Sequence, residues 1–418
     1  MGPDAVAIIQ GARLATRSND TEFRFRQASD FWYLTGFEHP DAVAVLRTDG
    51  GPEYTLFVQP RDPDAEVWTG FRPGVDGAVQ TYEADAAFPV AELESRLPDL
   101  LSGARQLYHQ LGCNTALDAR TTTILDGMRA RSRQGATPAS AISDPREILH
   151  EMRLFKSEEE LELMRHAAVI TSEAHAAAAR IAHEGHREFE LEAILDYTYR
   201  RRGGWGPAYG TIVAGGSNAT TLHYITNDQP LCNGELVLID SGAEFRGYAS
   251  DVTRTYPVGG RFEPSQRAVY EVVLEAQLAG LEACSPGNTL QDVHTVTTRR
   301  LVEGMVSLRL LNGTVDGLME QEAYKPYYMH STSHWLGLDV HDVGYYASEG
   351  KPRPLEPGMA FTVEPGIYIR EDAEAAPEHL RGIGVRIEDD VVVTAEGHEN
   401  LNTAIPKRID QIEAAVAG

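Results

Sequence analysis

Five side chains that could bind metal ions occur in a fixed order along the chain, each beside an apolar run typical of a strand. They are Asp240, Asp251, His334, Glu364 and Glu388. A carboxylate in a dry interior is costly unless it is compensated, and two carboxylates about 4 Å apart repel by about 4 kcal/mol at an effective dielectric near 20. Two divalent cations would balance the four carboxylates, and a neutral histidine nitrogen would complete the cluster. The pattern therefore predicts a site for two divalent metal ions.

The two aspartates are expected on neighbouring strands. Alternation along residues 235–240 places Asp240 on one face, and Asp251 shares a face with Thr253 on the following strand. Pairing Asp240 opposite Asp251 predicts a hairpin centred near residues 245–247, with the two Cβ atoms about 5 Å apart. Taken alone, the segment leaves open a turn-capping aspartate and a surface aspartate.

Three histidines, His330, His334 and His341, fall within twelve residues, and apolar residues alternate between the last two. A lone histidine in such a segment is most often a hydrogen-bonded core residue. Three of them in a chain that also carries paired acids favour ligand and proton-transfer roles, because imidazole titrates near neutral pH.

The two glutamates also lie at strand ends. Glu364 ends an apolar run directly before a Pro-Gly turn, and Glu388 follows Arg386 by two residues on the same strand face. A structural salt bridge between Arg386 and Glu388 is the alternative to a metal site. The adjacent Asp389 and Asp390 are expected to be solvated.

These residues need a scaffold of at least two domains, because 418 residues exceed what one hydrophobic core usually holds. The first part, residues 1–150, alternates strand-like runs at 6–9, 42–46 and 54–58 with a helical pattern at 90–101. It predicts a small α/β domain.

A second domain, residues 151–418, is expected after the break near Ser143-Asp144-Pro145. Its helix signals are a capping box at Ser157 to Glu160, a cationic helix end at 200–202 before two glycines, and helices at 264–282 and 290–303, the last stopped by Gly304. The remainder predicts mostly strands and turns.

Composition narrows the possible partners and compartment. A net charge of −25 argues against nucleic acid and anionic membrane surfaces as partners. The three cysteines, Cys113, Cys232 and Cys284, form no CxxC pair, so neither a zinc knuckle nor a disulfide framework is indicated. With no signal peptide or membrane-spanning run in the sequence, a cytoplasmic location is expected.

At this point a family resemblance becomes specific. The ligand order, the strings HWLGLDVHD, TVEPGIY and GVRIEDD, and the His223-Tyr224 pair resemble the pita-bread metallopeptidases of the creatinase, prolidase and aminopeptidase P family. The match is closest to the aminopeptidase P (Xaa-Pro aminopeptidase) branch. Residues 25–36 also resemble the segment that opens that family's companion domain. The resemblance implies an α/β N-terminal domain, then an α+β pita-bread catalytic domain with a curved antiparallel sheet flanked by helices.

The resemblance also implies roles for the ligands. Asp240 should chelate one metal ion, Asp251 and Glu388 should bridge both, and His334 and Glu364 should bind the other, with a metal-bridging hydroxide as the nucleophile. Glu364 should also shuttle a proton to the leaving proline nitrogen. Manganese is the expected metal, with Co²⁺, Zn²⁺ or Fe²⁺ possible in an oxygen-rich cage that has one imidazole and no thiolate.

Further residues are expected around the substrate. By resemblance, hydrogen bonds to the substrate or the oxyanion should come from His223, His330, His341 and Arg386. Tyr209 and Tyr368 correspond to active-site tyrosines, with simple packing as the alternative. The chain departs from the common pattern at Ser241, where alanine is usual, and at Ser331-Thr332-Ser333, a stretch that usually contains glycine.

The expected activity is removal of residue one from peptides with proline at position two, by a homo-oligomer such as a dimer or tetramer. A prolidase restricted to Xaa-Pro dipeptides is the near alternative, and a non-catalytic pita-bread binding module is a more distant one. A methionine aminopeptidase would share the metal cage but would not require so large an N-terminal domain.

Overall fold

The computed structural model describes residues 1–417, which form two compact units divided between Glu151 and Met152. The division falls within helix α6 (Arg146–Leu154). Each unit has its own hydrophobic core.

The first unit is built on a mixed six-stranded sheet with the order β6-β5-β4-β1-β7-β8. Its strands are β1 (Ala5–Gln10), β4 (Val43–Arg47), β5 (Tyr54–Val58), β6 (Ala86–Pro89), β7 (Gln106–His109) and β8 (Ala141–Ser143), with β2 (Thr16–Ser18) and β3 (Thr21–Glu22) forming a separate hairpin. The three strands predicted from the sequence are confirmed as β1, β4 and β5.

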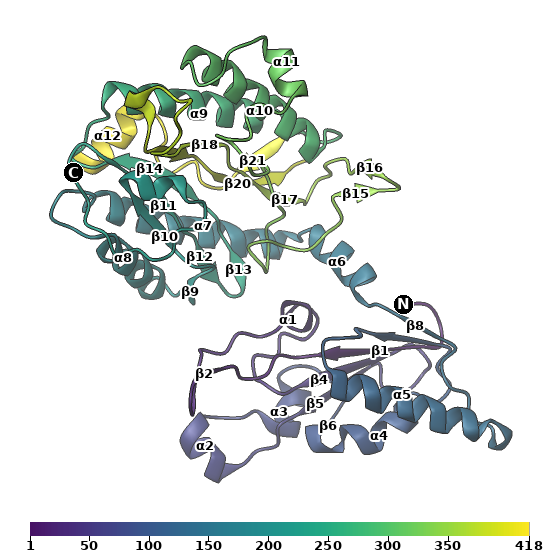
Figure 1. Ribbon diagram of the computed structural model, residues 1–418. Helices are drawn as coiled ribbons and strands as arrows, with labels where there is room; N and C mark the ends of the chain where they lie inside the picture. The colour runs from purple at the N-terminus through teal and green to yellow at the C-terminus, as the bar shows by residue number, and fades with distance from the viewer. Residues whose placement is uncertain (418) are drawn as a thin grey trace. The chain divides into compact units, whose positions relative to one another are not determined.

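Helices cover both faces of this sheet (Figure 1). They are α1 (Ser29–Thr35), α2 (Pro63–Thr69), α3 (Gly74–Gln80), η1 (Val90–Glu92), α4 (Leu93–Leu100), α5 (Thr115–Ala130) and η2 (Ser132–Gln134). Because successive strand residues point to opposite faces, Ile8 packs in one core with Leu97 of α4, whereas Ile9 packs in another with Phe31 of α1.

The second unit consists of short antiparallel sheets, with the orders β10-β11-β14, β13-β12-β9, β17-β20-β21, β18-β19 and β15-β16. The first strands are β9 (Gly206–Pro207), β10 (Ile212–Gly215), β11 (Leu236–Asp240), β12 (Ala243–Phe245), β13 (Tyr248–Ala249) and β14 (Thr253–Pro257). The later strands are β15 (Ala347–Ser348), β16 (Lys351–Pro352), β17 (Ala360–Val363), β18 (Gly366–Ile369), β19 (Ile383–Arg386), β20 (Asp389–Val393) and β21 (His398–Asn400).

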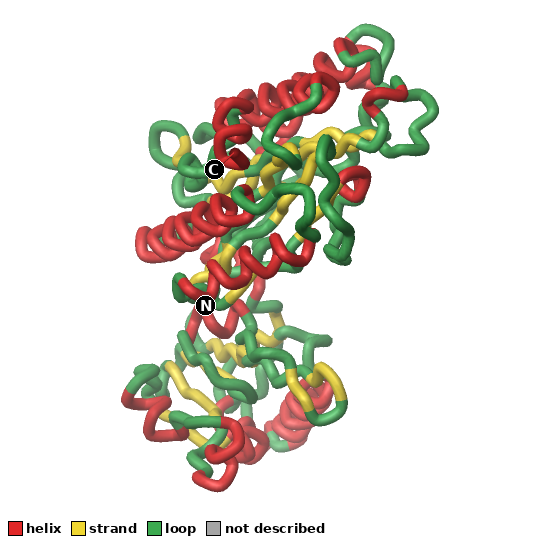
Figure 2. Tube along the Cα trace, turned by 90° about the vertical axis from the view of Figure 1, so that its left-hand side faces the viewer, coloured by secondary structure: helices red, strands yellow, loops and turns green. Residues whose placement is uncertain are grey.

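Long helices pack in two pairs, α7 with α8 and α9 with α10. Figure 2 shows helices in red and strands in yellow. The helices are α7 (Glu158–Ala179), α8 (Glu188–Arg201), η3 (Gly216–Thr220), α9 (Pro264–Glu282), α10 (Leu290–Ser307), α11 (Val315–Glu320), η4 (Glu378–Leu380) and α12 (Ile409–Ala417). The capping box predicted at Ser157 and Glu160 is confirmed at the start of α7.

The predicted stop of α10 at Gly304 is wrong, because the helix continues to Ser307. Gly304 lies against the side chain of Val272 on α9, where a Cβ atom would overlap that side chain. The glycine therefore allows two helices to approach closely rather than ending one of them. The short helices α11 and α12 were not expected from the sequence.

The predicted pairing of Asp240 with Asp251 is also wrong, since Asp240 lies opposite Thr253. The expected turn is present, with Arg246 and Gly247 both at positive φ. The intervening chain leaves the ladder after β11 and forms β12 and β13 in a different sheet. This change of sheet offsets the register, so Asp251 lies just before β14 and not within a continuous hairpin.

Across residues 1–417, no helix combines the length and apolar character that a bilayer crossing would need.

Candidate metal centre

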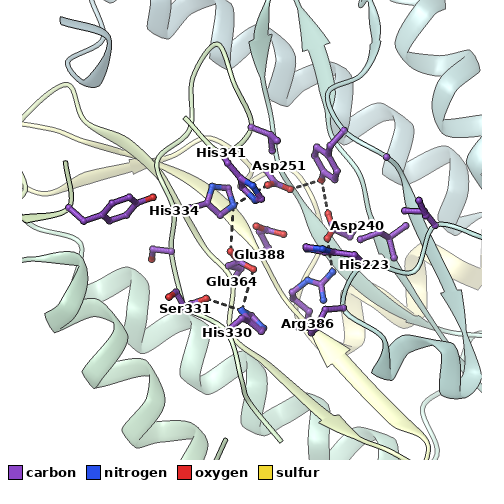
Figure 3. A pocket seen from close by; sticks show the side chains of 18 residues that line it. His223, Asp240, Asp251, His330, Ser331, His334, His341, Glu364, Arg386 and Glu388 are labelled. Carbon is purple, nitrogen blue, oxygen red and sulfur yellow. Dashed lines mark hydrogen bonds and ion pairs between the residues drawn. The ribbon is translucent and has the colours of Figure 1, made fainter. Parts of the chain in front are cut away.

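The five candidate ligands meet at one cavity of about 800 Å³ in the second unit, seen in Figure 3. Side chains from distant parts of the chain line it, including the predicted site residues Tyr209, His223, Asp240, Asp251, His330, His334, His341, Glu364, Arg386 and Glu388. Tyr368, which was also predicted, is fully buried beside the cavity. Its hydroxyl forms hydrogen bonds with two residues that line the cavity, His330 and Arg386.

Strand ends place the acids. Asp240 is the last residue of β11, Glu364 follows β17, and Glu388 lies between β19 and β20. His334 is tied to the strand before Glu364, because its N–H donates to Thr362 Oγ1 at 3.2 Å and its carbonyl accepts from Thr362 N at 3.0 Å. Backbone hydrogen bonds of the sheets therefore fix where the ligands stand.

The ligand atoms are close enough to share metal ions. One ligand atom from each of Asp251, His334 and Glu388 lies within 4.8 Å of the others. His334 Nε2 is 3.3 Å from Asp251 Oδ2 and 3.5 Å from Glu364 Oε1. These are separations at which one cation could contact several of the atoms at once.

Asp240 and Asp251 share a hydroxyl donor. Tyr209 Oη lies 2.6 Å from Asp240 Oδ1 and 2.5 Å from Asp251 Oδ1, and Arg386 Nη2 donates to the other oxygen of Asp240 at 2.5 Å. The single hydroxyl proton of Tyr209 can serve one carboxylate at a time. Tyr209 therefore makes hydrogen bonds to two candidate ligands in addition to packing contacts.

Thr253 is a site residue that the sequence reasoning did not identify. Its hydroxyl donates to Glu388 Oε2 at 2.6 Å and accepts from Arg386 Nε at 3.0 Å. Arg386 and Glu388 are thus linked through Thr253, and the structural salt bridge considered from the sequence is not the contact observed. The position of Thr253, two residues after Asp251 on one strand face, was the available signal.

The positive charges of the protein do not fully balance the negative charges of the acidic cluster, as the pKa values of two of its glutamates show. Burial, reinforced by Asp251, Glu364 and Asp240, raises the pKa of Glu388 well above its ordinary value. Burial likewise raises the pKa of Glu364 to about 8. For His334, the lowering effect of burial is outweighed by the hydrogen bond that its ring donates to Asp251 and by the charge of Glu364, so its pKa rises to about 9. Three buried carboxylates, the partly buried Glu364 and one histidine form a donor set that suits hard divalent cations.

His330 belongs to a separate hydrogen-bond chain beside the acids. Arg386 Nη1 donates to Tyr368 Oη at 2.9 Å, and Tyr368 Oη is 2.8 Å from His330 Nε2. The other ring nitrogen, Nδ1, is 2.8 Å from the carbonyl of Ser331. Burial, with the charge of Arg386, lowers the pKa of His330 to about 3, so it is neutral, with Nδ1–H donating to Ser331 and Nε2 accepting.

The expectation that Asp389 and Asp390 are solvated is wrong, because both are buried. Asp389 accepts from Arg254 at 2.6 Å, and Asp390 accepts from Ser250 Oγ at 2.7 Å and from the backbone N–H of Asp251 at 3.0 Å. They start the buried strand β20, so both side chains point into the protein. Their burial holds the segments that carry Glu388 and Asp251.

Part of the cavity wall is apolar and was not predicted. It is formed by Ile212, Leu222, Ile225, Val340 and Tyr346. Ile225 and Tyr346 keep 65% and 50% of their surface exposed, which places them at the open side of the cavity. No charge or motif distinguishes such residues in the sequence.

Two family models match the chain. Metallopeptidase family M24 matches residues 162–395, and the aminopeptidase P N-terminal domain matches residues 1–108.

Individual relatives match over almost the whole chain. Xaa-Pro aminopeptidase of Escherichia coli strain K12 is 44% identical over 99% of this chain and 94% of its own length. Human Xaa-Pro aminopeptidase 3 is 35% identical over 99% of this chain and 81% of its own. The solved structure of Pseudomonas aeruginosa aminopeptidase PepP superposes with a TM-score of 0.98 at 47% identity, covering 100% of this chain and 95% of that one.

Proposed function

The chain belongs to metallopeptidase family M24 and is a metal-dependent aminopeptidase of pita-bread fold, and from this premise we propose that it removes residue one from peptides whose second residue is proline. The observation that carries the proposal is the convergence of Asp240, Asp251, His334, Glu364 and Glu388 at one cavity. Five potential ligands separated by up to 148 positions in sequence would not gather in a buried site without cations to balance them.

In the proposed arrangement Asp240 would hold one metal ion, His334 and Glu364 would hold the other, and Asp251 and Glu388 would contribute to both. When bound, such ions supply an activated water nucleophile and polarise the scissile carbonyl. The protein residues then orient the peptide and move protons. Glu364 Oε2 lies 3.6 Å from His330 Nδ1 and faces the ligand cluster, a position suited to passing a proton to the leaving nitrogen.

His223, His330, His341 and Arg386 are proposed to hold the peptide and the developing oxyanion. The side chains of His223 and His341 line the cavity, and the ring centroids of His341 and His334 are 4.5 Å apart. Tyr368 bonds to His330 and Arg386 and so fixes the orientation of both. We propose that Tyr209, which lines the cavity next to Asp240, also contacts the substrate.

Divalent metal use is a property of the family, and we propose manganese as the native ion. The supporting feature is the ligand set, in which oxygen donors outnumber the single imidazole and thiolates play no part. Co²⁺, Zn²⁺ and Fe²⁺ could enter the same cage. A solved structure of a zinc-substituted Escherichia coli aminopeptidase P in complex with product has a TM-score of 0.96 to this chain.

The test is a peptide length series with the chelated protein and each metal added back. We expect cleavage of Xaa-Pro-Yaa peptides with Mn²⁺, and loss of at least about 100-fold in kcat for Glu388→Ala and Asp251→Ala. Cleavage of Xaa-Pro dipeptides without any tripeptide cleavage would instead identify a prolidase. Full activity in either alanine variant would contradict the bridging roles.

The proposal also covers assembly and location. We propose a homo-oligomer, a dimer or tetramer, and one supporting feature is the exposure of Val67, Trp68 and Phe71 in the first unit. Light scattering of the purified protein would give the number of subunits. We also propose a cytoplasmic location, supported by the three free cysteines.

A further inference from the structure

The segment 330–334 carries two functional histidines, and its central residue faces away from them. His330, Ser331, Ser333 and His334 line the cavity, whereas Thr332 does not and is fully buried. Its contacts therefore show how this chain holds the segment.

The side chain of Thr332 sits between two polar groups. Its Oγ1 atom is 2.6 Å from Tyr328 Oη and 2.8 Å from His294 Nδ1. Its backbone N–H also donates to His294 Nδ1, at 3.3 Å. Since that nitrogen accepts from the backbone, it carries no proton, and the hydroxyl of Thr332 must donate to it as well.

The remaining protons follow from this assignment. The hydroxyl of Tyr328 donates to Thr332 Oγ1, and His294 carries its proton on Nε2, which points toward Thr298 Oγ1 at 3.4 Å. Burial lowers the pKa of His294, in agreement with a neutral ring. The three side chains thus form one directed chain of hydrogen bonds from Tyr328 through Thr332 to His294.

This chain is connected to the metal centre on both sides of Thr332. The carbonyl of Thr332 accepts from the N–H of Glu364 at 2.8 Å. The ring of Tyr328 meets the ring of His330 edge to face, with centroids 4.9 Å apart. His330 and His334 each lie two residues from Thr332. A shift of Thr332 would therefore move His334, His330 and the backbone of Glu364 together.

We propose that His294, Tyr328 and Thr332 are positioning residues that hold His330, His334 and Glu364 in working geometry from behind the cavity. The proposal rests on the function proposed above for those three residues. It assigns a role to α10, which supplies His294, although no residue of α10 lines the cavity.

Thr332→Val tests the proposal because it keeps the shape of the side chain and removes the hydroxyl. Tyr328 Oη and His294 Nδ1 would each lose a partner in a buried environment. We expect Mn²⁺ affinity, measured by titration calorimetry on the chelated protein, to fall about 10-fold, in line with other partners that orient metal ligands. We also expect kcat on an Xaa-Pro-Yaa peptide to fall about 10-fold with KM little changed.

Two variants serve as controls. Thr332→Ser keeps the hydroxyl and should restore both quantities to within about 2-fold of the wild type. Thr297 lies on α10, as His294 does, and its buried hydroxyl has no hydrogen-bond partner in the described structure. Thr297→Val removes this hydroxyl and should change neither the Mn²⁺ affinity nor kcat. Tyr328→Phe removes only the first donor of the chain and gives a second test if Thr332→Val does not fold.

The outcomes separate positioning from packing. A lower melting temperature with wild-type Mn²⁺ affinity and kcat in both Thr332→Val and Tyr328→Phe would overturn the proposal, since the network would then only stabilise the fold. If the wild-type protein cleaved no Xaa-Pro-Yaa peptide, the proposed function would fail. The Mn²⁺ affinities of the variants would still decide the positioning role.

Discussion

His175 is a buried residue that contacts the backbone next to Asp240, a proposed metal ligand. It is fully buried on α7, its Nε2 lies 3.0 Å from the carbonyl of Ser241, and Tyr256 Oη lies 3.4 Å from its Nδ1. Ser241 follows Asp240 directly, and its side chain accepts a hydrogen bond from Tyr199 at 2.9 Å. Ser241 is therefore part of a buried network of hydroxyl groups.

The same residue should make stability depend on pH. Burial, aided by the charge of Arg254, lowers the pKa of His175 from 6.5 to about 4. The unfolded chain then binds a proton more readily than the folded protein, so stability is lost as pH falls from about 6.5 toward 4. At about 1.4 kcal/mol per pH unit, the loss from this group approaches about 3 kcal/mol.

Urea unfolding at pH 7 and pH 4.5 of the wild type and of His175→Gln would measure this contribution. Other titrating groups contribute to both proteins, so the difference between the two pH dependences isolates His175. We expect the variant to be less stable at pH 7 and to lose less stability on acidification. Parallel curves for the two proteins would contradict the assignment.

At the scale of elements, a buried ion pair joins strands β14 and β20. Arg254 donates to Asp389 at 2.6 Å, to the carbonyl of Glu388 at 2.6 Å and to the carbonyl of Thr253 at 2.9 Å. Asp389 also accepts from Gln277 of α9 at 2.8 Å. This pair holds the backbone of Glu388, a proposed bridging ligand, from the side opposite the cavity.

Removing the charge of Asp389 should therefore destabilise the fold strongly. In Asp389→Asn the guanidinium of Arg254 stays buried without its counter-ion, and such a loss costs about 3 to 5 kcal/mol. Chemical denaturation would measure the change. The matched control is Glu271→Gln, which breaks the exposed pair with Arg267 and should cost less than about 1 kcal/mol. Equal small effects in both variants would show that burial adds nothing to the pair at Asp389.

The sequence predicted elements best where local rules decide them. Tyr54–Val58 is a strand as predicted, and Pro264–Glu282 is a helix as predicted, since alternation, proline and capping act within a few residues. Prediction from the sequence failed where tertiary packing decides the outcome. Gly304 was predicted to end a helix, but it allows close packing against Val272 of the neighbouring helix. Asp389 was predicted to be solvated, but the fold buries it. Most of the polar residues that line the cavity were predicted from charge and resemblance, whereas its apolar residues carry no such signal in the sequence. Thr253 and Thr332 contact partners that only the fold brings near.

At the scale of the whole molecule, the proposed metal site belongs to one unit. All five ligands lie beyond residue 152, within the second unit. They come from the ends of β11, β17 and β19 and from the segments next to them. Bound metal ions should therefore cross-link these strands while leaving the sheet of the first unit without any direct restraint.

Metal removal and return should consequently change the two units differently. A ligand at 100 times its dissociation constant stabilises the folded state by about 2.7 kcal/mol per site. Hydrogen exchange followed by mass spectrometry should show slower exchange in peptides spanning β11, β14 and β20 when Mn²⁺ is added to chelated protein. Peptides spanning β4 and β5 of the first unit are the internal control and should exchange at unchanged rates. Equal slowing in both units would show that metal binding stabilises the chain as one cooperative body, and no slowing in the second unit would place the metal ions elsewhere.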